Sequence, residues 1–372
     1  MKVLITGCHG FVAKNLLAHL KVREDVEITQ FSREDSISSL NELVSRADFI
    51  FHLAGVNRPI DPEDFRSGNT DLTRLVCEGI IASGKKIPVL YTSSSQAELN
   101  NAYGASKLAA ERILFDLTAT HDVPVHIFRL PNVFGKWARP DYNSAVATFC
   151  NNIAHNKPIK INNADAALTL VYIDDVIAQF LEVMDGRLTG DPFVSAQPTY
   201  VTTVGEVAAQ LTAFRDSRET LLTEAVGAGL TRALYSTYLS YFPPERFTYD
   251  VPKYGDQRGV FVEMLKTQDS GQFSYFTAYP GITRGGHYHH SKTEKFLVIR
   301  GHACFRFRHI VSGEFYELCT TGEKPQIVET VPGWTHDITN VGNDEMIVML
   351  WANEVFNRDL PDTYVLPVGT EV

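Results

Sequence analysis

Short apolar runs alternate with amphipathic stretches over the first part of the chain. The run at residues 48–55 is almost continuously apolar, which is typical of a parallel strand covered on both faces. Apolar residues between such runs recur at helical spacing, as at Leu16, Leu17 and Leu20. Further strands are predicted at residues 3–6, 26–31, 88–92 and 125–130, and further helices at 103–115, 175–184, 203–214 and 233–241. This order predicts an α/β domain with a doubly wound parallel sheet.

The pattern changes after Pro243 and Pro244, because two adjacent prolines prevent a helix from continuing. Short alternating runs separated by glycines then follow, without helical periodicity. They predict strands at residues 259–265, 272–278, 295–300, 303–310, 326–331 and 346–351. We therefore expect an all-β jelly-roll barrel at residues 257–372, either a closed barrel or a double-sheet jelly roll. A linker at 243–256 would join it to the α/β domain at 1–242.

Composition narrows the class of protein. The 372 residues are 44% hydrophobic and 21% charged, as in globular proteins, and the net charge of −10 argues against nucleic-acid binding. No apolar run approaches the roughly 18 residues that span a bilayer, and the chain starts directly with a strand-like segment. Five scattered cysteines without CxxC spacing are typical of reduced thiols, so we expect a cytoplasmic protein without nucleic-acid or membrane partners.

A glycine-rich turn follows the first predicted strand and precedes a helix, which predicts a Rossmann-type dinucleotide site. Small residues let the backbone approach a pyrophosphate, and the helix N-terminus favours its charge. The small-residue loop after the 48–52 strand would let the dinucleotide pass. Predicted cofactor-binding residues are Thr6, Gly7, Gly10, Phe11, Val12, Leu53, Ala54 and Gly55. His52 we interpret as a packed strand residue.

Ser32 and Arg33 follow the second predicted strand, where an enzyme that uses NAD usually has Asp or Glu. A small residue followed by arginine suits a 2′-phosphate, so the sequence favours NADPH. Arg33 could instead be an exposed loop cation, and Glu34 and Asp35 beside it weaken the distinction.

Tyr103 and Lys107 are one helical turn apart and therefore share a face. A phenol has a pKa of about 10, and a neighbouring ammonium favours the phenolate. Ser94, at the end of a predicted strand, could hold a carbonyl oxygen against the phenol, with Ser95 as the neighbouring alternative. Together these groups could protonate a carbonyl oxygen while hydride reaches its carbon.

The C-terminal domain contains His287 and His289, whose side chains share one face of a strand because strand side chains alternate. Glu294 and the distant His336 could complete a set of three imidazoles and one carboxylate. Such a set suits zinc, iron, manganese or nickel.

These motifs resemble the extended short-chain dehydrogenase/reductase family that acts on nucleotide sugars, over roughly residues 1–240. The matching segments are the glycine turn, the HLAG and YxxxK motifs, Pro131 to Gly135 and Leu168 to Asp175. The resemblance implies Tyr103 as proton donor and Lys107 as its tuning group and holder of the ribose hydroxyls, so that both contact the cofactor. It also implies that Asn132 lies near the substrate or its diphosphate. Lys136 and Arg139 could meet a nucleotide diphosphate or could be solvated loop charges.

The segment from Gly281 to Gly301 matches the cupin signature, and a reductase joined to a cupin resembles the CapF-like enzymes of capsule and O-antigen synthesis. That resemblance implies a homodimer that binds zinc and a UDP-sugar. The cupin would epimerise C3 of a UDP-2-acetamido-2,6-dideoxy-4-hexulose, and the reductase would reduce C4 with NADPH. His290 and Lys295, which are adjacent to ligands, are candidate bases or structural residues. Alternatively, the chain is a reductase or 4-epimerase whose cupin is a non-catalytic, zinc-stabilised binding or dimerisation module.

Overall fold

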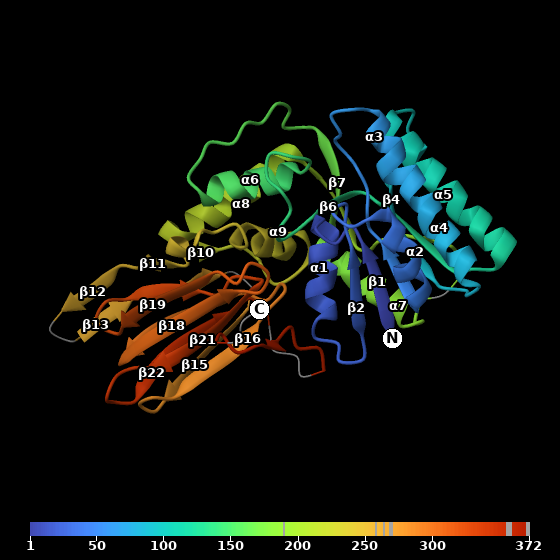
Figure 1. Cartoon of the computed structure of the whole chain (residues 1–372). Coiled ribbons are helices and arrows are strands. Elements are labelled where there is room, and N and C mark those ends of the chain that lie inside the picture. Colours follow the sequence, from blue (N-terminus) through green and yellow to red (C-terminus); the bar gives the residue numbers. More distant parts are fainter. Residues whose placement is uncertain (189, 257–258, 263–264, 268–270, 355–358, 370–372) are drawn as a thin grey trace. The chain divides into compact units, whose positions relative to one another are not determined.

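The computed structural model in Figure 1 folds into two compact units, each built from separate segments of the chain. The first unit comprises residues 1–133 and 169–201, and the second comprises 134–168 and 202–372. The structure describes residues 1–188, 190–256, 259–262, 265–267, 271–354 and 359–369. No helix within these ranges is long and apolar enough to cross a membrane.

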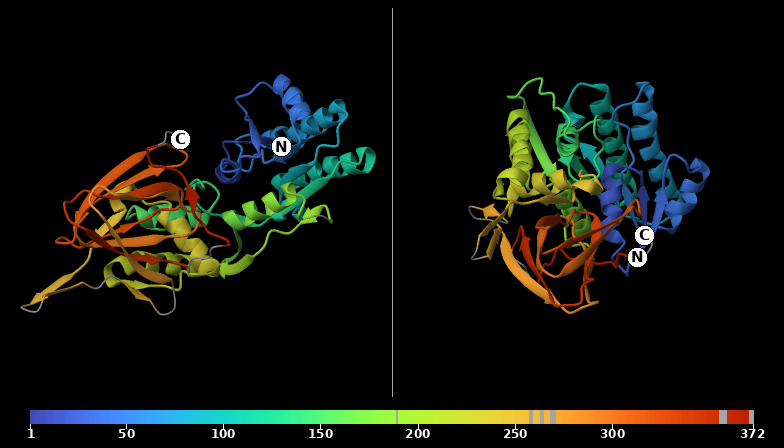
Figure 2. Two further views of the ribbon diagram at one scale, coloured as in Figure 1. Left: turned by 90° about the horizontal axis from the view of Figure 1, so that it is seen from below. Right: turned by 90° about the vertical axis from the view of Figure 1, so that its left-hand side faces the viewer.

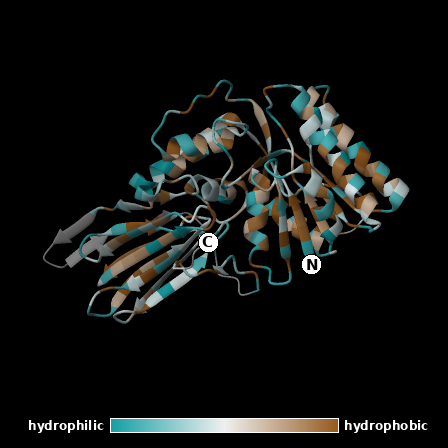
Figure 3. Ribbon diagram, viewed as in Figure 1, coloured by the Kyte–Doolittle hydropathy of each residue, from teal (hydrophilic) through white to brown (hydrophobic). Residues whose placement is uncertain are grey.

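The first unit is built around a six-stranded parallel sheet of order β2-β1-β3-β4-β5-β8. The order of strand addition reverses between β1 and β3, and ligands of such sheets bind at this switch point, beyond the carboxyl ends of the strands. These strands appear largely in brown, the colour of apolar residues, in Figure 3. Their bounds are β1 Lys2–Thr6, β2 Glu27–Phe31, β3 Phe49–His52, β4 Val89–Ser94, β5 Val125–Leu130 and β8 Phe193–Val194.

Helices cover both faces of this sheet. Helices α2, α4 and α5 share one buried apolar cluster with the sheet. On the other face, Phe180 of α7 contacts the rings of Phe51 and Phe128 at centroid distances of 6.1 and 4.8 Å. The predicted doubly wound α/β fold is therefore confirmed. The helices are α1 Phe11–Leu20, α2 Ile37–Arg46, α3 Glu63–Phe65, the π-helical η1 Arg66–Asp71, α4 Leu72–Ser83, the 3-10 turn η2 Ser95–Glu98, α5 Ala102–His121 and α7 Ile173–Met184.

The second unit contains two five-stranded antiparallel sheets, of order β11-β20-β17-β22-β15 and β19-β18-β21-β16-β23. The two sheets lie face to face (Figure 2). Between them, the ring of Phe296 lies 5.7 Å from that of Phe305 in the other sheet. The predicted double-sheet, all-β architecture is thus confirmed. The strands are β11 Thr248–Asp250, β15 Gln272–Ala278, β16 Thr283–Tyr288, β17 Glu294–Arg300, β18 His302–His309, β19 Phe315–Thr321, β20 Gln326–Glu329, β21 Trp334–Asn340, β22 Met346–Ala352 and β23 Tyr364–Val365.

The same unit also contains helices α6 Ala145–Ala154, α8 Val204–Thr220 and α9 Gly229–Leu239 and the 3-10 turn η3 Pro244–Arg246. Tyr235, Tyr238 and Phe242 are buried among them, as expected for core residues. The remaining strands are β6 Asn132–Phe134, β7 Ala167–Tyr172 and β9 Thr199–Thr203, which pair with one another, and β10 Leu222–Thr223, β12 Lys253–Asp256, β13 Gly259–Val262 and β14 Lys266–Thr267.

The two compact units do not test where the predicted domains begin and end. The boundaries of the α/β domain at 1–242, the linker at 243–256 and the all-β domain at 257–372 therefore stay a prediction. Residues 257 and 370–372 lie outside the described ranges, as do residues 263–264 of the strand predicted at 259–265.

Candidate functional site

The glycine turn after β1 lies directly against the loop that follows β3. Gly7 has a φ of +69°, and a Cβ atom there would lie 2.6 Å from the Ala54 Cα atom, so only glycine fits. The Gly10 N–H donates to the Gly7 carbonyl at 2.8 Å, and α1 begins at the next residue. A helix N-terminus beside a close backbone approach fits a pyrophosphate. The fold brings together the predicted cofactor residues Thr6, Gly7, Gly10, Phe11, Val12, Leu53, Ala54 and Gly55 at this edge.

His52 is fully buried and is held at both ring nitrogens, by the Thr6 hydroxyl at 2.7 Å and the Thr73 hydroxyl at 2.8 Å. Thr73 donates its own proton to the Asn69 carbonyl, so it accepts from Nε2–H, and Nδ1 accepts from Thr6. Burial lowers the pKa of His52 to about 3, so the ring is neutral. The interpretation of His52 as a packed strand residue is confirmed, and Thr6 takes part in fixing β1 to β3.

Asn69 is a positioning residue that the sequence analysis did not identify, because its polar segment has no clear periodicity. Its side-chain amide bonds both the N–H and the carbonyl of Val56, at 2.8 and 3.0 Å, and donates to the Ser106 hydroxyl of α5 at 2.9 Å. A Cβ atom on Gly55 would lie 3.0 Å from Asn69 Oδ1 and from Lys107 Nζ. The predicted cofactor loop and the helix that carries Lys107 are therefore fixed side by side.

Tyr103 and Ser94 meet because α5 begins very close to the end of β4. A Cβ atom on Gly104 would lie 2.1 Å from the Gln96 carbonyl oxygen, so glycine permits this approach. Ser94 is buried and lowers the pKa of the Tyr103 phenol by hydrogen bonding, whereas Ser95 is exposed. Of the two candidate serines, the surroundings therefore favour Ser94 as the neighbour of the phenol.

Burial controls the acidity of both groups on α5. Burial raises the pKa of Tyr103 more than the hydrogen bond with Ser94 lowers it, so the phenol keeps its proton at neutral pH. We expected the Lys107 ammonium to be the main influence, but it donates to the Thr92 carbonyl at 2.9 Å. Burial lowers the pKa of Lys107 to about 8, against the raising effect of Glu111.

Glu111 is a second residue that the sequence did not single out. It is only 1% exposed, accepts from the Ser93 hydroxyl and binds the Arg129 guanidinium through both oxygens, at 3.0 and 2.7 Å. It therefore joins β4, next to Ser94, to β5 and to α5. A lone carboxylate in a helical pattern gives no signal of such a role.

Ser32 and Arg33 lie at the end of β2, where an adenosine ribose is expected. The Asp35 carboxylate turns back onto Ser32, accepting from its N–H at 2.7 Å and its hydroxyl at 3.0 Å. Arg33 is exposed. The Asp35 carboxylate is therefore engaged in hydrogen bonds to Ser32, whereas the Arg33 side chain is exposed to solvent.

The three predicted substrate residues belong to two units. Asn132 is in the first unit and donates to the Thr169 carbonyl at 3.2 Å. Lys136 and Arg139 are in the second unit. Lys136 is buried with its ammonium 5.4 Å from the Trp137 ring, and the exposed Arg139 lies over the Tyr142 ring at 5.2 Å.

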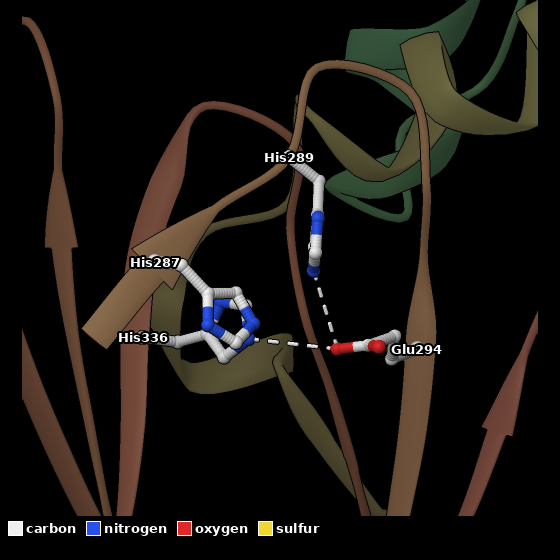
Figure 4. A group of neighbouring side chains, drawn as sticks. All are labelled: His287, His289, Glu294 and His336. Carbon is white, nitrogen blue, oxygen red and sulfur yellow. Dashed lines mark hydrogen bonds and ion pairs between the residues drawn. The ribbon is translucent and has the colours of Figure 1, made fainter. Parts of the chain in front are cut away.

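The second unit brings His287, His289, Glu294 and His336 together, with one potential ligand atom of each within 4.8 Å of all the others. Figure 4 shows the three imidazoles turned toward the carboxylate. His287 lies on β16, His289 in the loop after it, Glu294 on β17 and His336 on β21. Glu294 Oε2 lies 3.3 Å from His289 Nε2 and 3.5 Å from His336 Nε2. These four residues are called the histidine–glutamate cluster below.

The chemistry of the histidine–glutamate cluster fits a divalent cation. The His289 Nδ1–H donates to the Asp362 carbonyl, which leaves a lone pair on Nε2, beside Glu294. Burial lowers the pKa of His287 to about 3 and also lowers that of His336. Burial alone would raise the pKa of Glu294, but the neighbouring imidazoles of His289 and His336 hold it well below its ordinary value. Neutral imidazoles and an ionised carboxylate are what a cation requires.

The two candidate bases beside the cluster have different surroundings. Lys295 follows Glu294 on β17 and points to the opposite face, where it bonds Glu329 at 2.5 Å and the Tyr249 hydroxyl at 3.0 Å. Burial alone would lower the pKa of Lys295, but Glu329 holds it well above its ordinary value. This geometry does not favour Lys295 as a base. The buried His290 contacts the rings of Tyr288 and Tyr364.

Lys292, which the sequence analysis did not consider, contacts the other oxygen of the cluster's carboxylate: its Nζ lies 3.3 Å from Glu294 Oε1. An ammonium that touches the ligand set was not visible in the sequence, because residues 289–293 form a loop without strand alternation.

Comparison with known proteins gives two family matches. Residues 3–194 match the NAD dependent epimerase/dehydratase family, and residues 254–364 match the polysaccharide biosynthesis C-terminal domain. A Pseudomonas aeruginosa protein named UDP-2-acetamido-2,6-beta-L-arabino-hexul-4-ose reductase is 63% identical over 369 residues, which are 99% of each chain.

Among solved structures, the capsular polysaccharide assembling protein CapF from Staphylococcus aureus is similar over nearly the whole chain. It is 40% identical, with a TM-score of 0.69 over 99% of this chain and 100% of that one. A UDP-glucuronic acid 4-epimerase from Bacillus cereus, in complex with NAD, is 17% identical, with a TM-score of 0.51 over 57% of this chain and 82% of its own. This last likeness concerns the fold alone.

Proposed function

Because the chain belongs to the NAD dependent epimerase/dehydratase family and carries a polysaccharide biosynthesis C-terminal domain, we propose that it is a UDP-sugar enzyme with two activities. The antiparallel sheets epimerise C3 of a UDP-2-acetamido-2,6-dideoxy-4-hexulose, and the parallel-sheet unit then reduces C4 with NADPH. The product is UDP-2-acetamido-2,6-dideoxy-L-talose. The name of the Pseudomonas relative and the similarity to CapF support this substrate class, and with it a homodimer.

The close approach of α5, which carries Tyr103 and Lys107, to the end of β4 at Ser94 is the observation that carries the reduction step. A bound reduced nicotinamide supplies the hydride for C4. Ser94 holds the C4 oxygen by a hydrogen bond, and Tyr103, protonated at neutral pH, gives its proton to that oxygen. Lys107, beside the cofactor loop, binds the ribose hydroxyls and stabilises the phenolate that forms.

NADPH is the preferred cofactor in this proposal. The Asp35 carboxylate accepts hydrogen bonds from Ser32, so it is engaged within the turn rather than directed to the ribose hydroxyls of NAD. The exposed guanidinium of Arg33 is suited to a 2′-phosphate, because arginine binds phosphate through two parallel hydrogen bonds.

The histidine–glutamate cluster supports the epimerisation step. His287, His289, Glu294 and His336 would hold a divalent cation, zinc by the family resemblance. A bound cation supplies Lewis acidity, which makes the C3 proton of a 4-ketone easier to remove. Because His289, Glu294 and His336 are buried, a stabilising role for the ion, in a non-catalytic binding or dimerisation module, is the second candidate.

Product analysis tests the proposal. The protein is incubated with the UDP-4-keto sugar and NADPH, and the product is examined by NMR spectroscopy. We expect NADPH oxidation and the L-talo product, in which both C3 and C4 have changed. A reduced product with unchanged C3 would favour the non-catalytic module, and a lack of NADPH oxidation would overturn the reductase assignment.

A further inference from the structure

Residues 359–369 form the last segment that the structure describes, and part of it pairs with β16, the strand that carries the ligand His287. Strand β23 pairs with β16, in register His287 to Val365 and Tyr288 to Tyr364. The Leu366 N–H donates to the Gly286 carbonyl at 2.9 Å. The segment is therefore an added strand next to His287, and we call it the C-terminal strap.

Asp362 in the strap makes the densest set of contacts with the ligand loop. Its carbonyl accepts from His289 Nδ1, and its carboxylate accepts from three consecutive backbone N–H groups, at 2.9, 2.7 and 2.7 Å. The donors belong to His290, Ser291 and Lys292, and the Ser291 hydroxyl adds a fourth bond at 3.0 Å. A single aspartate thus fixes the whole turn between the second histidine ligand and Glu294.

We propose that Asp362 is the positioning residue of the histidine–glutamate cluster, and that the strap determines how tightly the cluster binds its cation. The Asp362 carbonyl fixes the tautomer of His289 in which Nε2 carries the lone pair. The carboxylate orients Lys292, whose ammonium contacts Glu294. Asp362 therefore acts on two of the four ligands without being a ligand itself. This inference rests on the cation binding in the proposed function.

The physical cause lies in the acceptor oxygens of Asp362. Both carboxylate oxygens face backbone N–H donors of the turn, and a carboxylate offers acceptors only. An asparagine at this position would keep one carbonyl oxygen but would turn an NH₂ group toward N–H donors. The turn would then open, and His289 and Lys292 would lose their orientation.

The test compares Asp362→Asn with Asp344→Asn, which makes the same change at an exposed position. Affinities for Zn²⁺ are measured by competition with a chromophoric chelator, and the ligand field is read from the visible spectrum of the Co²⁺ form. Loss of a partner that orients a metal ligand typically costs about 10- to 100-fold in affinity. We expect such a loss, with a changed Co²⁺ spectrum, for Asp362→Asn only. Wild-type affinity and spectrum would overturn the inference.

Asp362→Glu provides a second variant in case the asparagine form does not fold. It keeps the charge, and we expect an affinity between those of the wild type and Asp362→Asn; an unchanged affinity would again overturn the inference. If the wild type binds neither ion, the proposed cation site falls and takes the inference with it. If the wild type binds and the Asp362 variants match it, only the inference falls.

Discussion

The two candidate sites both bury charged groups, but they balance the charge differently. At Tyr103, the nearest partners of the Lys107 ammonium are a backbone carbonyl and the Tyr91 ring, and burial lowers its pKa. In the histidine–glutamate cluster, Glu294 meets two imidazoles and the Lys292 ammonium. The first site buries an ammonium whose charge is poorly compensated, which suits proton transfer. In the second site a carboxylate is matched by imidazoles and an ammonium, which suits the binding of an ion.

The strongest test of this contrast is Tyr103→Phe. The variant loses the proton that we assign to C4 reduction, and general acid catalysis contributes about 10²- to 10⁴-fold. We expect kcat for NADPH oxidation to fall within that range, while NADPH binding, measured by fluorescence titration, stays close to the wild type. Tyr275→Phe, at a tyrosine that is 71% exposed, is the control. Undiminished turnover would remove Tyr103 from the mechanism.

Lys295→Met tests whether the residue next to Glu294 is structural. Removing one partner of a buried ion pair costs about 3–5 kcal/mol. Glu329 would keep Arg218, its other partner at 2.8 Å, so we expect a loss near the lower end in denaturant unfolding. Zn²⁺ affinity should stay within a few-fold of the wild type. A stable variant that has lost C3 chemistry would instead make Lys295 catalytic.

Arg33→Ala tests the cofactor preference of the first site. Hydrogen bonds to charged groups contribute about 1.5–3 kcal/mol, so the variant should bind NADPH about 10- to 100-fold more weakly, with little change for NADH. Arg46→Ala, at an exposed arginine of α2, is the matched control. Equal losses for both cofactors would argue against a 2′-phosphate contact.

The lowered pKa of Lys107 gives a prediction with two signs. Between about pH 8 and pH 10.5 the unfolded chain binds a proton that the folded chain has lost, so stability should rise with pH. Activity that needs the ammonium should fall over the same interval, by about tenfold at pH 9 for one group that titrates near pH 8. A kcat/KM profile and unfolding curves at pH 7 and pH 9 check both. Activity that stays flat to pH 10 would contradict the assigned role.

The sequence could place the candidate residues of the first site near one another because they are local. Ser94, Tyr103 and Lys107 lie within one strand–helix connection, and Gly104 allows the close approach of the helix. The sequence did not predict the roles of Asn69 and Glu111, because an amide or carboxylate that bonds across elements leaves no periodic pattern in the chain.

Strand alternation was the basis for grouping His287 with His289, and the same alternation places Lys295 on the face opposite to Glu294. The sequence alone left Lys295 as a candidate base, and the structure shows its ammonium bonded to Glu329 instead. Asp362 could not have been found in this way. It lies more than 70 residues from His290 along the chain, and its contacts depend on how the strap pairs with β16.

Deuterium exchange at C3 separates the two sites most directly. Tyr103→Phe, which cannot complete the reduction, is incubated with the UDP-4-keto sugar in deuterated water without NADPH, and the sugar is examined by NMR spectroscopy. Our account predicts that deuterium enters at C3, and that the double variant Tyr103→Phe, Glu294→Gln shows none. No incorporation by a folded, zinc-loaded Tyr103→Phe protein would contradict the account and leave the reductase as its only activity.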